Sequence, residues 1–236
     1  EVGRMARSFT PTPVSKTKPS AATVLQGVVD NPKVPQVLRD IAKQLQRWGD
    51  KQLDEISVEF GAKFRQRNVL GEYHPLKHAV KVGKGKRALN AGDKDAVGTT
   101  LHEIMHGLTS LKYHWGKRNP DSVHGKIVAE IDDLFTKASR AAQKAGLASQ
   151  PFEVRYGFTN PREFMAVMME GNQDFYRFLE KLELPKGTLP DTFAPSLVGE
   201  MYDSMRRLLG LDLEQANALT RALDLSEQLA KTPARY

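Results

Sequence analysis

The sequence contains no cysteine among its 236 residues. This absence excludes a disulfide-bonded scaffold, a zinc or iron–sulfur site with thiolate ligands, and a thiol nucleophile. Long apolar runs are missing as well: no stretch approaches about 18 uninterrupted apolar residues, so the sequence predicts no membrane-spanning helix. The composition, 40% apolar and 27% charged, is that of a globular protein with a sizeable core. Any chemistry must therefore come from His, carboxylate, Tyr or Ser side chains, or from a metal ion.

Basic residues outnumber acidic ones and give a formal net charge of +7. We interpret this excess first as a solubility feature. The sequence carries no nucleic-acid recognition motif, so nucleic acid is not an expected partner. The first residue is Glu1 rather than Met, and no charged-then-apolar leader follows it. We therefore expect a soluble piece of a longer polypeptide.

The chain divides into two predicted parts. Residues 1–22 are rich in Pro, Ser and Lys and lack apolar periodicity, which predicts a flexible tether. Residues 23–236 are predicted to form a single, mostly helical α+β domain. In this domain a helix and a sheet extend to about residue 111, and only helices follow.

The predicted sheet is small and lies between helices. A helix is expected over 33–49, with Asn31 before Pro32 as its start signal. The turn at residues 74–77, with Pro near its second position, predicts a hairpin between the last two strands, in a mixed or antiparallel sheet. The three strands are predicted over 56–60, 69–73 and 78–82.

Helices are predicted for almost all of the chain from Asp95 onward. A continuous apolar stripe with helical spacing predicts the first of them, over 95–111. The stripe consists of Val97, Leu101, Ile104, Leu108 and Leu111. Further helices are predicted over 120–144, 161–181, 195–209 and 212–230.

The first of these helices carries the pattern HExxH, as His102-Glu103-Ile104-Met105-His106. Residues four apart on an α-helix differ by about 400° of rotation, so both imidazoles leave the same side and can meet one ion. Glu103 lies about 100° further round than His102. Its carboxylate can therefore flank the metal and hold a water molecule without being a ligand.

A catalytic zinc ion needs a third protein ligand besides the two histidines. The metzincin solution, a His six residues after the second, is absent because Lys112 stands there. His114 follows His106 by eight residues, beyond the predicted helix end. No motif surrounds the remaining histidines, which are His74, His78 and His124. We expect these three at the surface or at a sheet edge, which leaves a carboxylate from a later helix as the third ligand.

The segment from residue 156 to 172 offers such a carboxylate, in the pattern Tyr-x6-Glu-Phe-x-Ala. Together with HExxH, this pattern resembles the gluzincin type of zinc metallopeptidase, in particular the anthrax lethal factor-like catalytic domains. Similar domains occur in large polypeptides of bacteriophages and mobile elements, which would place the protein in a virion or deliver it within a larger protein. The resemblance implies a zincin-like fold in which His102, His106 and Glu163 hold one Zn²⁺ ion. It also implies peptide-bond hydrolysis, with Glu103 as general base and the Tyr156 phenol directed at the reaction centre.

Two features of this segment leave alternatives open. Val167 stands where the family usually has an acid four residues after the ligand glutamate, so the partner that orients a histidine ligand is missing there. Glu170 is a candidate replacement. Glu163 has a second explanation, because it forms a capping box with Asn160. For Glu170 and Asp174 the alternative is a solvated acidic stripe.

The strand predicted over 78–82 comes immediately before the HExxH helix. In zincin-like folds a strand in this place aligns an extended peptide through main-chain hydrogen bonds. The resemblance therefore implies a polypeptide substrate, bound in extended form along this edge strand. The alternative function is a metal-binding structural or interaction domain within a larger phage or toxin polypeptide, with Val167 as the sign of lost catalysis.

Overall fold

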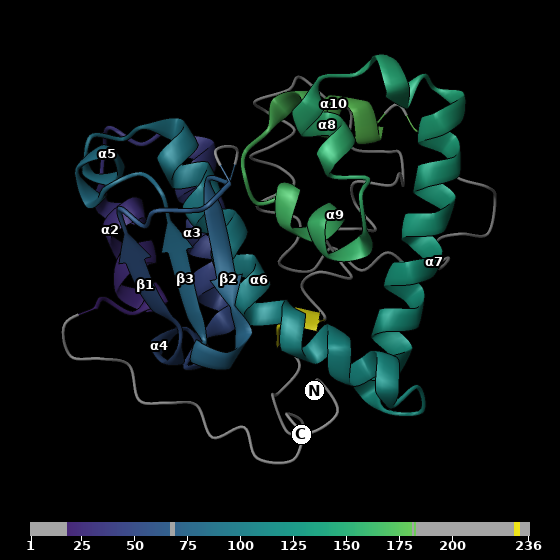
Figure 1. Ribbon diagram of the computed structural model, residues 1–236, viewed down its shortest axis with the longest axis horizontal. Helices are drawn as coiled ribbons and strands as arrows, with labels where there is room; N and C mark the ends of the chain where they lie inside the picture. The colour runs from purple at the N-terminus through teal and green to yellow at the C-terminus, as the bar shows by residue number, and fades with distance from the viewer. Residues whose placement is uncertain (1–17, 67–68, 181, 183–228, 232–236) are drawn as a thin grey trace.

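The computed structural model describes residues 18–66, 69–180, 182 and 229–231, and Figure 1 shows the arrangement of their elements. The elements before the long central helix are α2 (Ala21–Asp30), α3 (Gln36–Gly49), α4 (Gln52–Glu55), β1 (Ser57–Phe60), β2 (Gly71–His74), η1 (Pro75–Lys77), β3 (Ala79–Val82) and α5 (Lys86–Asn90). The central helix and those after it are α6 (Lys94–Arg118), α7 (Val123–Lys144), η2 (Leu147–Ser149), α8 (Phe152–Tyr156), α9 (Pro161–Val167) and α10 (Gln173–Glu180). This confirms the expected α+β class, mostly helical with a small sheet.

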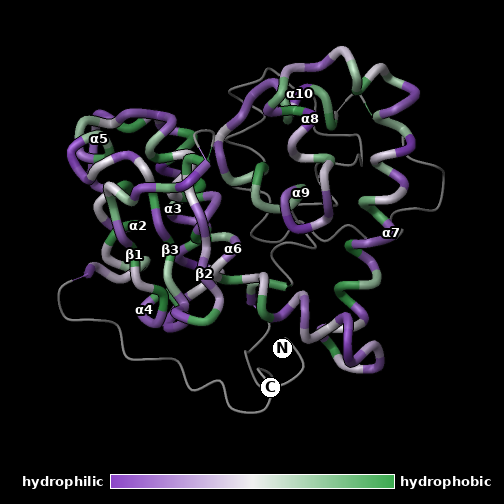
Figure 2. The backbone as a smooth tube through the Cα atoms, viewed as in Figure 1, coloured by the Kyte–Doolittle hydropathy of each residue, from purple (hydrophilic) through white to green (hydrophobic). Residues whose placement is uncertain are grey.

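Two lobes are visible in Figure 1. We call residues 18–93, which contain the sheet and α2–α5, the sheet lobe, and residues 123–180, which contain α7–α10, the helical lobe. Helix α6 runs from the sheet lobe to the base of α7 and packs against elements of both. None of the described helices is long and apolar enough to cross a bilayer. Apolar and polar positions alternate along α7 in Figure 2 rather than forming runs.

The sheet has the strand order β1-β3-β2. Strand β1 pairs with β3 in parallel, with Ser57 opposite Ala79, and β2 pairs with β3 in antiparallel, with Gly71 opposite Val82. The predicted hairpin is confirmed, but the expectation that 78–82 is the edge strand is wrong. The apolar side chains of β3 are buried, which suits a central strand, whereas the residues of β2 are partly buried or exposed and suit an edge.

The N-terminal prediction also needs correction. Helix α2 begins at Ala21, inside the range predicted as a tether, and Ser20 caps it by accepting a hydrogen bond from the Thr23 amide at 3.3 Å. The rest of the tether prediction, residues 1–17, lies outside the described residues. Asn31 ends α2 instead of starting the next helix, which begins only at Gln36 because a turn and Pro35 intervene.

Helix α6 is longer than predicted, with 25 residues. Asp93 caps it by accepting hydrogen bonds from the amides of Asp95 and Ala96, both at 3.0 Å. The predicted apolar stripe is buried from Val97 to Leu108. Because the helix continues to Arg118, the expectation that His114 lies beyond its end is wrong.

The helix predicted over 161–181 is two helices. Helix α9 ends at Val167, and a turn follows in which Gly171 has φ +72°, a conformation that favours glycine. The Tyr176 hydroxyl fixes this turn, since it donates to the Met168 carbonyl at 2.5 Å and accepts from the Gly171 amide at 3.1 Å. The helix predicted over 120–144 is confirmed as α7. The helices predicted over 195–209 and 212–230 lie outside the described residues, apart from a helical turn at 229–231.

Candidate metal centre

Helix α6 presents His102 and His106 on one side, as the four-residue spacing predicts. Both imidazoles are buried, and their Nε2 atoms lie 3.0 Å apart. The rings meet edge to face, with an angle of 75° between their planes. The two nitrogen atoms therefore point toward a common position.

Glu163 reaches the same position from α9. Pro161 and the Asn160 cap fix the start of this helix, and the Asn160 side chain accepts hydrogen bonds from the amides of Arg162 and Glu163. The cap that the sequence suggested is thus real, but the Glu163 carboxylate extends toward the histidines. Its Oε2 atom lies 3.1 Å from His102 Nε2 and 3.2 Å from His106 Nε2.

The three donor atoms form a nearly equilateral triangle with sides of 3.0, 3.1 and 3.2 Å. A tetrahedral ion about 2.0–2.1 Å from each nitrogen or oxygen ligand holds those ligand atoms about 3.3–3.4 Å apart. The triangle is therefore close to one face of such a tetrahedron. Within the described residues this is the cluster of His and carboxylate side chains that can hold a metal ion.

Glu103 lies beside the triangle and is only 6% exposed. Burial, together with the charges of Glu163 and Glu170, outweighs the attraction of His102 and raises the pKa of Glu103 to about 7. Gly71 of β2 makes room for it, since a Cβ atom on Gly71 would lie 2.7 Å from both Cγ and Oε1 of Glu103. Strand β2 and the Glu103 carboxyl therefore lie side by side at the site, and this carboxyl can exchange a proton near neutral pH.

Tyr156, at the end of α8, is half-buried next to the same atoms. Its ring stacks on the His102 imidazole, with 6.3 Å between the centroids and 28° between the planes. Its hydroxyl is hydrogen-bonded to Glu163, and burial together with that carboxylate raises the pKa of Tyr156, so the phenol stays protonated. The phenol is thus a hydrogen-bond donor at the edge of the triangle.

Glu170 holds the other side of the first histidine. Its Oε1 atom lies 2.6 Å from His102 Nδ1, so it supplies the carboxylate that Val167 lacks. Val167 is fully buried in the core at the end of α9, and Glu170 follows in the turn. The turn comes close enough because residue 98 is glycine: a Cβ atom there would lie 2.8 Å from the Glu170 carbonyl oxygen.

Protonation at the centre follows from these contacts. Burial lowers the pKa of His102, but the hydrogen bonds that its imidazolium donates to Glu163 and Glu170 outweigh burial and raise the pKa to about 10. Burial dominates at His106 and lowers its pKa. The two histidines lower the pKa of Glu163 despite its burial, so that carboxylate stays ionised. In the metal-free protein the first histidine therefore carries a proton that a metal ion has to displace.

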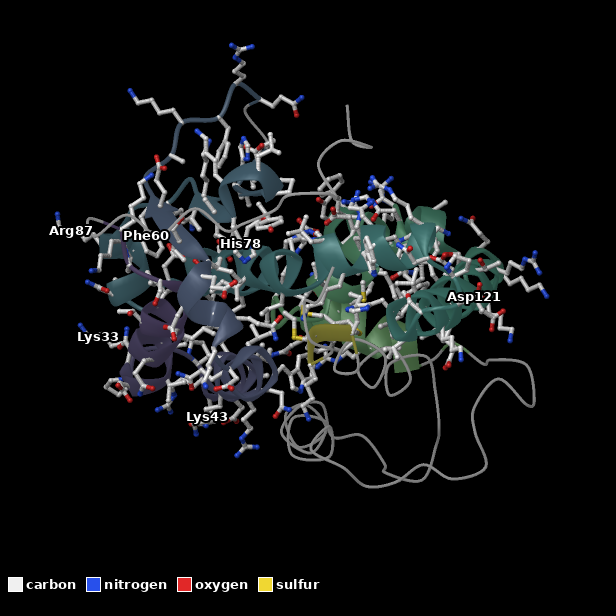
Figure 3. The ribbon with its side chains drawn as sticks, turned by 90° about the horizontal axis from the view of Figure 1, so that it is seen from below. Lys33, Lys43, Phe60, His78, Arg87 and Asp121 are labelled. Atoms are coloured by element: carbon white, nitrogen blue, oxygen red, sulfur yellow. The ribbon has the colours of Figure 1, made fainter. Side chains whose placement is uncertain are left out.

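The remaining histidines lie elsewhere. His74 lies on the edge strand β2, as expected, whereas His78 and His124 are buried and outside the strands, so the expectation of a surface or sheet-edge position is wrong for these two. His78, labelled in Figure 3, sits in the β2–β3 turn with φ +45° and contacts the Tyr73 hydroxyl through Nδ1 at 2.7 Å. His124 packs against α6 at Gly116. Lys112, in the metzincin position, is buried and donates to the Ala230 carbonyl at 2.5 Å.

Sequence reasoning missed the roles of two glycines. Gly98 interrupts a helical pattern, where glycine is about 1 kcal/mol less favourable than alanine, and this was a readable sign of a close approach. Gly71 had no such sign, because its contact with Glu103 depends on how the sheet packs on α6. Asp174 is exposed and pairs only weakly with Arg177, at 4.0 Å.

Comparison of the chain with models of known protein families, with curated proteins and with solved structures gave no match. The class of site therefore follows from its donor atoms. Two imidazole nitrogens and one carboxylate oxygen define a candidate centre for a divalent transition-metal ion.

Proposed function

We propose that the protein is a zinc-dependent metallopeptidase of the gluzincin type, with a zincin-like fold. The observation that carries this proposal is the 3.0–3.2 Å triangle of His102, His106 and Glu163 donor atoms. The nitrogen and oxygen donors suit Zn²⁺, and three protein ligands leave one position open, as in catalytic zinc sites. The neighbouring acid supplies the proton transfers that hydrolysis requires, and the phenol supplies a hydrogen-bond donor.

When bound, the ion supplies a Lewis acid that lowers the pKa of water from 15.7 to about 7. Glu103 accepts the proton of the attacking water and passes it to the amine that leaves the scissile bond. In the metal-free protein its pKa is about 7, and a general base works best when its pKa lies near the working pH. The Tyr156 hydroxyl donates a hydrogen bond to the oxygen on which negative charge develops. Glu170 keeps the His102 ring oriented through Nδ1.

The substrate in this proposal is a polypeptide in extended conformation. Strand β2 is at the edge of the sheet and adjoins Glu103 through Gly71. An extended peptide that adds to β2 would pass the base and the three ligands, and its main chain would supply most of the recognition. This assigns to β2 the role that the sequence had suggested for residues 78–82.

Metal analysis and peptide cleavage test the proposal together. We expect one zinc ion per chain, and cleavage of an unfolded protein or a peptide library that a chelator abolishes and added zinc restores. Zinc without any cleavage would instead support the structural or interaction module, and no zinc would contradict both.

The variant Glu103→Gln tests the base. It should keep its zinc and lose at least about 100-fold in kcat/KM, because removing a general base costs 10²–10⁴-fold. Glu55→Gln, an exposed glutamate on α4, is the matched control and should cleave normally. Normal cleavage by Glu103→Gln would remove this residue from the role of base.

A further inference from the structure

The residue next to a candidate metal ligand carries a guanidinium group. Arg162 precedes Glu163 on α9, and its Nη1 atom lies 3.2 Å from Nε2 of His114 on α6. His114 is eight residues beyond His106, so it lies about 12 Å further along the helix and about 80° further round. Arg162 and His114 thus join the two helices that carry the metal ligands.

The charge of Arg162 is not neutralised in the described part of the chain, where no carboxylate pairs with it. Asp132, on the neighbouring α7, accepts hydrogen bonds from Tyr113 and from Lys117 instead. His114 does not compensate either, because burial and the charge of Arg162 lower its pKa and leave it neutral. The link between Arg162 and the centre is structural, because Arg162 precedes the candidate ligand Glu163 on α9 and contacts the helix that carries both histidine ligands.

We propose that Arg162, held by His114, is a binding site for a carboxylate group of the substrate. This inference rests on the proposed peptidase function. The planar guanidinium matches a carboxylate with two parallel hydrogen bonds, and the contact to a neutral imidazole orients it without consuming its charge. An extended peptide rises about 3.3 Å per residue, so a carboxylate held here lies within about four residues of the scissile bond. It comes either from an acidic side chain or from the free C-terminus of the substrate.

Paired peptides distinguish these two sources. One series carries Glu or Gln at each position within four residues of the cleaved bond, and a second carries a free or an amidated C-terminus. Binding is measured by fluorescence anisotropy on the zinc-loaded Glu103→Gln variant, and cleavage is measured on the wild-type protein. We expect one carboxylate position to improve affinity and kcat/KM about tenfold over its neutral partner. Preference for the free C-terminus alone would assign the site to the terminal carboxylate.

Substitution of the arginine tests its part in this preference. Arg162→Gln should reduce the tenfold ratio to about one, and Arg162→Lys should restore part of it because the charge remains. Arg87→Gln removes the same charge from α5, at the outer end of the sheet lobe, and should keep the full ratio. Each variant is combined with Glu103→Gln for the binding measurement, and its zinc content is determined.

Each remaining result contradicts the carboxylate site, the peptidase function, or both. Cleavage without any carboxylate preference overturns the site and leaves the peptidase function standing. Binding that shows the carboxylate preference, without any cleavage, supports the site and contradicts the peptidase function. If Arg162→Gln loses zinc and weakens both members of each pair equally, Arg162 only positions Glu163, and the carboxylate site is refuted. Absence of both binding and cleavage refutes both.

Discussion

The side chain of Glu170 orients the imidazole of His102, the first of the three candidate metal ligands. Its Oε1 atom lies 2.6 Å from His102 Nδ1, which leaves Nε2 facing the triangle. In metal sites such an outer carboxylate fixes the tautomer and raises the basicity of the histidine. The sequence alone allowed a solvated acidic stripe here, because an unbroken helix over 161–181 would not show which acid turns inward.

Glu170→Gln is therefore expected to weaken zinc binding about 10- to 100-fold, because the His102 ring loses its anionic partner. The measurement is competition with a chromophoric chelator at fixed pH. Asp174→Asn, an exposed acid in the next helix, is the control and should bind zinc as the unmodified protein does. Equal affinities for the two variants would show that the Glu170 contact does not support the metal.

At the scale of secondary structure, the strongest sequence signals predicted the elements well. Helices α3, α6 and α7 carry long apolar stripes, and the turn at residues 74–77 predicted the β2–β3 hairpin. Local patterns could not predict the order of the strands, because β1 pairs with β3 although β2 lies between them in the sequence. The end of α9 was missed because Gly171 terminates a pattern whose apolar period continues into α10.

The close contact between α6 and the turn after α9 gives a prediction for Gly98. Alanine favours a helix by about 1 kcal/mol over glycine, yet its Cβ atom would lie 2.8 Å from the Glu170 carbonyl oxygen. The backbone clash should outweigh the propensity and move Glu170 away from His102. We expect Gly98→Ala to weaken zinc binding about tenfold without raising Tm.

Gly27→Ala is the matched control for this substitution. Gly27 lies in α2, and a Cβ atom added to it would meet no atom within 4 Å beyond the adjacent backbone of its own helix, so only the propensity changes. The substitution should raise the free energy of unfolding by up to about 1 kcal/mol and leave zinc affinity unaltered. Normal zinc binding by Gly98→Ala would mean that the turn can shift without disturbing the centre.

At the scale of the whole molecule, the metal ion would join α6 to the helical lobe. Ligands from α6 and α9 are 57 residues apart in the sequence, so zinc bound to the folded state should stabilise both helices at once. The general positions of these ligands were predictable from their motifs. Their convergence on one point was not, because it depends on the packing of α9 against α6.

The zinc-induced rise in Tm should depend on pH. The raised pKa of His102, about 10, means that its imidazolium stabilises the metal-free fold below its unfolded pKa of about 6.5, and that this contribution is lost as pH rises through 10. Zinc must displace that proton, so its affinity should increase about tenfold per pH unit between pH 6.5 and 8. Differential scanning fluorimetry with stoichiometric zinc should show the larger shift at pH 8.

Glu163→Gln serves as the reference in this experiment, because the triangle then lacks its anionic ligand. It should show little zinc-induced shift at either pH. Equal shifts for the unmodified protein at pH 6.5 and pH 8 would contradict a protonated His102 in the metal-free state.

The missing side chain at Gly71 bears on how the proposed peptidase could be inhibited. The Glu103 carboxylate lies against this bare backbone, so its conformation depends on the edge strand of the sheet. A strand-mimicking compound laid on β2 would need only a small substituent over residue 71 to press on the acid. Such a compound could block the proposed turnover without any metal-chelating group. Its selectivity would then come from strand β2 and Glu103 rather than from zinc binding, unlike that of general zinc chelators.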